Sequence, residues 1–236
     1  MSQQTRPVSE EQRRWLSGEL SAWQSAGIVS GEQAAQVIDG AGFCFLFAQR
    51  FHPAMRHAGG PRRELGVRTI FNILGPLANP ARPRAMLAGV GARPFGPLMA
   101  ETFRLRGLER AIVVHSEDGL DEISTAAPTH AWFVERGRVE ERHLSPADFG
   151  LPGHPLAAVV GGDPGHNAGL MQAVLDGGEG PITDFVLMTA SAALYTAGTT
   201  ADLQEGVALA RESIASGQAR EALDRYVSLS QGFPHE

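Results

Sequence analysis

From Phe43 onward, short apolar runs bounded by glycine and proline alternate with segments of helical periodicity. This alternation is typical of an α/β fold, in which helices cover a largely parallel sheet. The candidate strands are 43–48, 85–91 and 110–115, and residues 95–107 between the last two have helical spacing. A strand, a helix and a second strand in this order form a unit of ordinary length. The sequence therefore predicts an α/β fold with a mainly parallel sheet.

Two further segments of alternating polarity, 129–135 and 138–144, flank the dipeptide Arg136-Gly137. Two residues that include a glycine between two such segments predict a β-hairpin. From residue 167 onward the chain has helical periodicity, and Thr200 and Asp202 lie near the start of one of these helices, where an N-cap is expected. The helices predicted there are 167–175, 183–197, 200–213 and 220–228.

The first forty residues have a different pattern. Ser9 with Gln12 and Ser30 with Gln33 are capping-box pairs, which open helices. The sequence therefore predicts a pair of short helices over residues 9–39, separate from the α/β pattern that follows.

The chain has 236 residues, of which 43% are hydrophobic and 19% are charged, as in a globular protein with one sizeable core. The formal net charge is −6, and no run of basic residues occurs, which argues against binding to nucleic acid or to an anionic membrane. The chain contains 20 arginines and no lysine. The absence of lysine excludes a Walker-type phosphate loop and a Schiff-base lysine.

Localisation is indicated by what the sequence lacks. The N-terminus has no apolar signal-peptide core, and the longest weakly polar stretch, 185–198, is too short to span a bilayer. The single cysteine, Cys44, lies in an apolar run, where packing is a better interpretation than nucleophilic catalysis. We expect a cytoplasmic protein in a reducing compartment.

A basic cluster lies between His52 and Arg68, with four arginines and two histidines flanked by apolar runs. Arginine can bind a carboxylate through two parallel hydrogen bonds, so an anionic ligand with an aromatic body would suit this segment. From residue types alone, a solvated helix face with packed histidines is the favoured alternative. A zinc site is not indicated, because His52 and His57 are five residues apart and no cysteine pair lies nearby.

An acidic cluster, residues 117–122, follows the predicted strand 110–115 and contains four carboxylates. Ligand sites in open α/β sheets favour the carboxyl ends of strands, and adjacent carboxylates repel unless a cation joins them. Asp121 and Glu122 are therefore candidate Mg²⁺ ligands. A solvated acidic turn is an equally good interpretation of these residues alone.

The segment Gly161-Gly162-Asp163, ahead of Asn167, has two interpretations. Its backbone N–H groups could bind a phosphate at the start of a helix. Glycine pairs are common at turns, however, and the favoured interpretation is a helix cap.

In this order and spacing, the segments resemble the anthranilate phosphoribosyltransferases, a family related in fold to the nucleoside phosphorylases. The resemblance rests on short motifs spread from about Phe43 to the C-terminus. They are residues 45–48, 52–55, 62–66, 72–80, 118–122, 161–163 with Asn167, 192–195 and 205–210. The implied organisation is an N-terminal helical segment, 1–40, followed by an incomplete family domain, 41–236.

The resemblance implies transfer of phosphoribosyl from phosphoribosyl pyrophosphate to anthranilate, a step of tryptophan biosynthesis. Arg62 would bind the anthranilate carboxylate, with His52 and His57 in the same pocket. Asp121 and Glu122 would bind Mg²⁺, the implied cofactor, on the diphosphate of the donor. With the resemblance added, a site becomes the favoured interpretation of both clusters. The partners would be these small molecules, and a homodimer stays open.

Several family features are missing from the sequence. No Gly-Thr-Gly-Gly-Asp loop or Lys-His-Gly-Asn segment occurs, Gln49 stands where the family has proline, and Thr189 where it has asparagine. We expect the chain alone to have impaired activity or none, since its phosphate-binding loop is missing. The alternatives are a pseudoenzyme or binding module derived from the family, acting as a regulatory partner or nucleic-acid binder, and a truncated gene product.

Overall fold

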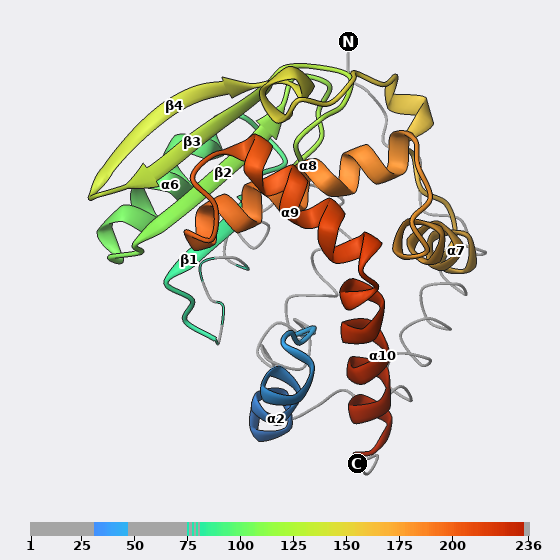
Figure 1. Cartoon of the computed structure of the whole chain (residues 1–236). Coiled ribbons are helices and arrows are strands. Elements are labelled where there is room, and N and C mark those ends of the chain that lie inside the picture. The colour runs from blue at the N-terminus through green and yellow to red at the C-terminus, as the bar shows by residue number, and fades with distance from the viewer. Residues whose placement is uncertain (1–30, 47–74, 76, 78, 80, 234–236) are drawn as a thin grey trace, which may run out of the picture. The chain divides into compact units, whose positions relative to one another are not determined.

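The computed structural model describes residues 31–46, 75, 77, 79 and 81–233 (Figure 1). It divides into two compact units, residues 70–219 and residues 1–69 with 220–236. Among the described residues, no helix combines the length and apolar character needed to cross a bilayer.

The larger unit is built on a four-stranded sheet in the order β1-β2-β3-β4. The strands are β1 Ala85–Gly89, β2 Arg110–Ser116, β3 Thr129–Glu135 and β4 Arg138–Leu144. β1 and β2 are parallel and are connected by helix α6, Phe95–Leu105, whereas β2, β3 and β4 pair antiparallel. Arg136 and Gly137 both have positive φ, 50° and 72°, which suits a tight two-residue hairpin turn.

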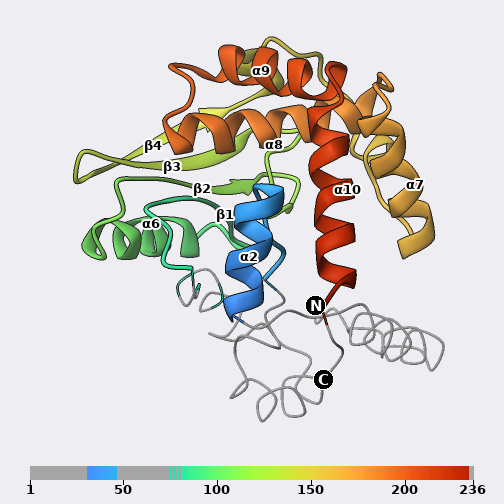
Figure 2. The same cartoon turned by 60° about the horizontal axis from the view of Figure 1, so that its bottom comes forward.

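Both faces of the sheet are covered by helices, as Figure 2 shows. Alternate residues of β2 point to opposite faces. Ile112 and Val114 join the core under α8, Pro181–Ala197, and α9, Leu203–Ala215. Ala111 and Val113 pack with α6. The α/β fold class is therefore confirmed. The described sheet is mixed rather than mainly parallel, because β1 and β2 form its one parallel pair and both pairs that involve β3 are antiparallel.

The other short elements of this unit are 3₁₀ turns η1, Pro146–Phe149, and η2, Leu156–Ala158, and helix α7, Pro164–Leu175. Asp202 caps α9 by accepting a hydrogen bond from the backbone N–H of Glu205 at 2.8 Å, as its sequence position predicts.

The smaller unit contains helix α2, Gly31–Ala41, and most of helix α10, Gln218–Gln231. Ala34, Val37 and Ala41 are buried against Tyr226, with Cys44 partly buried beside them. The packing role expected for Cys44 fits this position, and burial raises the pKa of its thiol, so the reactive thiolate is disfavoured.

The predicted elements differ from the structure in a few places. Residues 43–46 form no strand, because Phe43 stacks on the Tyr226 ring of α10 with 4.9 Å between centroids. An apolar run of this length suits a strand and a packing segment equally. Helix α6 ends at Leu105, two residues before the predicted end. Of the helical pair predicted over residues 9–39, the second helix is confirmed as α2, and the first lies outside the described residues. The boundary at residue 40 stays a prediction.

Candidate functional site

The acidic cluster follows β2 at the edge of the sheet where the parallel strands β1 and β2 both end. The two strand ends are joined by hydrogen bonds from the backbone N–H of Val90 to the carbonyl of Val114, 3.0 Å, and between His115 Nδ1 and the carbonyl of Val90, 2.8 Å. This is the edge at which open α/β sheets bind ligands. The predicted position of the cluster is therefore confirmed.

Asp118 holds the turn that carries the cluster. Its carboxylate accepts the hydroxyl of Ser124 at 2.5 Å and the backbone N–H of Leu120 at 3.4 Å. Burial opposes ionisation of Asp118, but hydrogen bonds from Ser116, Ser124 and Leu120 outweigh it and lower the pKa of Asp118. The Asp118 carboxylate therefore stabilises the turn through hydrogen bonds within it.

Gly89, the last residue of β1, fixes where the next part of the turn lies. A β-carbon built on Gly89 would stand 1.7 Å from the backbone carbonyl oxygen of Asp121. Only glycine allows this approach, because real β-carbons do not come within 3.0 Å of another heavy atom. The backbone of Asp121 is therefore packed directly on the end of β1.

Asp121 and Glu122 are both exposed to solvent. Partial desolvation by the surrounding turn, together with the charge of Asp121, raises the pKa of Glu122. A bound cation would remove this repulsion, and oxygen ligands of this kind are the ones Mg²⁺ prefers. The donor set fits a magnesium ion at this position.

A polar network that the sequence did not reveal ties the turn to the helices. Thr125 and His154 exchange hydrogen bonds through their backbones and the Thr125 hydroxyl. His154 Nε2 lies 2.7 Å from Asp184 Oδ2 on α8, and Arg211 of α9 lies 3.8 Å from the other oxygen of Asp184. These residues lie far apart in sequence, so no local pattern could have indicated the network.

The segment Gly161-Gly162-Asp163 caps helix α7. Asp163 accepts the backbone N–H of His166 at 2.9 Å, and the Asn167 amide both accepts from and donates to the backbone of Gly162. The favoured interpretation, a helix cap, is confirmed.

The predicted anthranilate-binding residues Arg62, His52 and His57 lie outside the described residues, as does Gln49. Their roles stay predictions. Of the predicted site residues, the structure describes Asp121 and Glu122, which are adjacent and lie on the same exposed turn.

Comparison with known proteins identifies the class of protein. The profile of the family described as "Glycosyl transferase family, a/b domain" matches residues 20–220, so the chain belongs to this family. The match to this family begins at residue 20, whereas the sequence motifs described above begin near Phe43.

Within that class, the chain belongs to the anthranilate phosphoribosyltransferases. It is 45% identical over 236 residues to the anthranilate phosphoribosyltransferase of Thermomicrobium roseum, covering 96% of this chain and 68% of the relative. It is 46% identical over 230 residues to that of Sinorhizobium medicae, covering 95% of this chain and 68% of the relative. The family resemblance predicted from the motifs is confirmed.

Solved structures of anthranilate phosphoribosyltransferases are also similar to this chain. The anthranilate phosphoribosyltransferase of Thermus thermophilus matches with a TM-score of 0.80 and 43% identity, over 89% of this chain and 63% of that one. The enzyme of Saccharomyces cerevisiae in complex with PRPP and Mg matches with a TM-score of 0.81 and 28% identity, over 92% and 63%. The chain thus spans a little under two thirds of the length of these solved relatives.

Proposed function

We propose that this chain carries the magnesium-binding part of an anthranilate phosphoribosyltransferase, which transfers phosphoribosyl from phosphoribosyl pyrophosphate to anthranilate. The observation that carries the proposal is the exposed pair Asp121 and Glu122, held at the end of β1 by the close packing of the Asp121 backbone on Gly89. The identity to curated anthranilate phosphoribosyltransferases supports the reaction. The yeast relative solved with PRPP and Mg supports the donor and the metal.

In the proposed reaction, the anthranilate amine forms a bond to the anomeric carbon of ribose as the bond from that carbon to pyrophosphate breaks. Negative charge builds up on the departing diphosphate, and a magnesium ion bound there would neutralise it. Asp121 and Glu122 would hold the ion at the sheet edge, while Asp118 keeps the turn in shape through its hydrogen bonds to Ser124 and Leu120.

The acceptor site rests on the resemblance alone. Arg62 would bind the anthranilate carboxylate through two parallel hydrogen bonds, and His52 and His57 would line the pocket. The yeast relative was also solved in complex with 4-fluoroanthranilate, which supports an aromatic acid as the acceptor.

Donor binding provides the first test. Calorimetric titration of the chain with phosphoribosyl pyrophosphate should show binding that requires Mg²⁺. The double variant Asp121→Asn, Glu122→Gln should weaken it at least tenfold, about 1.4 kcal/mol. The control Glu212→Gln removes an exposed carboxylate of α9 and should change nothing. Equal affinity in the double variant and the wild type would refute the proposed role of the pair.

Turnover is a separate question, because the 236 residues contain no Gly-Thr-Gly-Gly-Asp loop and no lysine. A donor diphosphate bound from one side only is poorly positioned for transfer. We therefore infer that this chain, assayed alone, turns over more than about tenfold more slowly than a full-length relative. Donor binding with no turnover at all would favour the binding-module alternative, and turnover within that factor would show that the loop is dispensable.

A further inference from the structure

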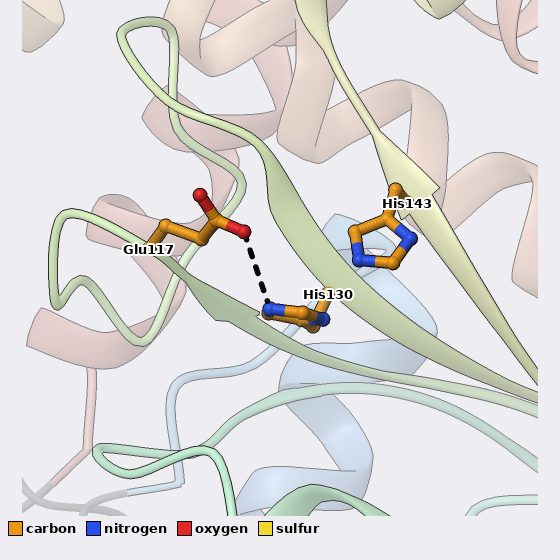
Figure 3. A group of neighbouring side chains, drawn as sticks. All are labelled: Glu117, His130 and His143. Atoms are coloured by element: carbon orange, nitrogen blue, oxygen red, sulfur yellow. Dashed lines mark ion pairs between the residues drawn. The ribbon is translucent and has the colours of Figure 1, made fainter.

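A second cluster of metal-ligating side chains starts from Glu117, the first residue of the acidic cluster, and adds two histidines from the β3–β4 hairpin. Glu117, His130 and His143 each offer one ligand atom, and these atoms all lie within 4.8 Å of one another. Figure 3 shows the Glu117 carboxylate and the His143 ring on either side of the His130 ring. Asp121 and Glu122 are not members of the cluster.

The sheet register brings the two histidines together. His130 of β3 is directly paired with His143 of β4, so both side chains lie on one face, with ring centroids 4.5 Å apart. Glu117 joins them because its backbone N–H bonds to the carbonyl of Pro128, just before β3, at 3.0 Å. The three side chains are therefore held near one another by backbone pairing.

His130 is buried, with 3% of its surface exposed, yet both of its ring nitrogens face carboxylates. Nδ1 lies 3.3 Å from Glu141 Oε1, and Nε2 lies 3.5 Å from Glu117 Oε1. A neutral imidazole has one N–H and can donate to only one of them. The second nitrogen then presents its lone pair to a carboxylate oxygen, an arrangement that is favourable only if a proton or a metal ion lies between them.

Glu141 is the nearer of the two carboxylates and lies in hydrogen-bonding geometry to Nδ1. Its carboxylate also pairs with Arg93 at 3.5 Å, and its Oε1 can accept Nδ1–H of His130 at 3.3 Å. A carboxylate that accepts one ring N–H of a histidine, and leaves the other nitrogen free, is the usual support behind metal-ligating histidines. With Nδ1 facing Glu141, the other ring nitrogen, Nε2, points toward Glu117 (Figure 3).

The ligand set indicates the class of ion. Two imidazole nitrogens with one carboxylate suit Zn²⁺ and similar first-row ions, whereas Mg²⁺ prefers oxygen ligands alone. Metal–ligand bonds of about 2.0–2.1 Å in a tetrahedron place ligand atoms about 3.4 Å apart. Glu117 and His143 are exposed, so their side chains can close the remaining distance around the fixed His130.

We propose that Glu117, His130 and His143 bind one zinc-class divalent ion, with water completing the coordination, at a site separate from the proposed magnesium pair. The ion would link the start of the acidic turn to the β3–β4 hairpin. The inference does not depend on the transferase activity, because all of its ligands and supports differ from Asp121 and Glu122.

The test is calorimetric titration of the full chain, without a histidine tag, with Zn²⁺ in excess Mg²⁺. We expect one equivalent to bind, and Zn²⁺ to raise the melting temperature of the wild type. His143→Ala and Glu117→Gln, both at exposed positions, should each weaken binding at least about tenfold. The matched control His166→Ala removes an exposed histidine of α7 and should leave the affinity unchanged.

Cobalt substitution gives an independent measurement, since Co²⁺ in a four-coordinate nitrogen and oxygen site absorbs visible light much more strongly than hydrated Co²⁺. The absorption should appear with one equivalent of Co²⁺, disappear on addition of Zn²⁺, and be absent in His143→Ala. Melting curves in the presence of a chelator verify that each variant is folded. The proposal is overturned if no stoichiometric binding occurs, or if neither exposed-ligand variant weakens it.

Discussion

Replacing Gly89 by alanine is the sharpest perturbation of the acidic turn that removes none of its carboxylates. The new β-carbon would lie 1.7 Å from the carbonyl oxygen of Asp121 and 2.7 Å from its carbonyl carbon. Both contacts involve backbone atoms, which cannot rotate away as a flexible side chain can. To restore a separation of 3.0 Å, the turn must retreat from the end of β1 by about 1.3 Å.

Overpacking of this kind costs about 1–3 kcal/mol of folding stability. A displacement of about 1 Å at a ligand-positioning group can lower activity by about 100-fold. Gly89→Ala should therefore lower the melting temperature and also weaken Mg²⁺-dependent donor binding more than the stability loss alone explains. Both quantities are measured on the same preparation, by differential scanning calorimetry and by isothermal titration at a temperature where the variant is fully folded.

Gly169→Ala is the matched control. Gly169 lies inside α7, with ordinary backbone angles and nothing within 4 Å of the β-carbon that alanine would add, so alanine there should be neutral or stabilise the helix by up to about 1 kcal/mol. The reasoning is refuted if Gly89→Ala retains both the melting temperature and the donor affinity of the wild type.

Three other variants test the turn and its supports. Asp121→Asn removes the charge that helps to raise the pKa of Glu122. Folded Glu122 binds a proton more tightly than the unfolded chain, so stability falls as pH rises through its pKa, and this loss should be smaller in the variant when unfolding is followed against pH. Ser124→Ala removes a 2.5 Å hydrogen bond to Asp118, so urea unfolding should show a loss of about 1–3 kcal/mol, and the pKa of Asp118 should rise. Asp184→Asn replaces the carboxylate that lies 2.7 Å from His154 Nε2 by an amide, and should lower the free energy of unfolding in urea by about 1.5–3 kcal/mol. Unchanged stability would show that this network does not support the turn.

Much of the fold was predictable because its signals are local. Two segments on either side of a two-residue turn located the hairpin over 129–135 and 138–144, which the structure reproduces residue for residue. The N-cap at Asp202 was predictable for the same reason, since the capping side chain bonds only three residues ahead. The position of the acidic cluster followed from the strand before it.

The predictions that failed, and the clusters that were missed, depend on contacts between distant residues. The apolar run at 43–46 carries no periodicity that separates a strand from a packing segment, and its partner Tyr226 lies at the other end of the chain. Glu117, His130 and His143 are brought together by strand register, and His154 meets Asp184 across thirty residues. In each case, the chemistry depends on which elements pair, which a single sequence does not specify.

The most direct test of the proposed magnesium site is a crystal of the chain grown with phosphoribosyl pyrophosphate and Mn²⁺ in place of Mg²⁺. The anomalous signal of manganese locates the ion independently of the protein. We predict an ion coordinated by Asp121, Glu122 and oxygen atoms of the donor diphosphate, and loss of that signal in the double variant. The proposed magnesium site would be contradicted if the manganese bound to the donor diphosphate contacted neither Asp121 nor Glu122, and both of these carboxylates pointed toward solvent.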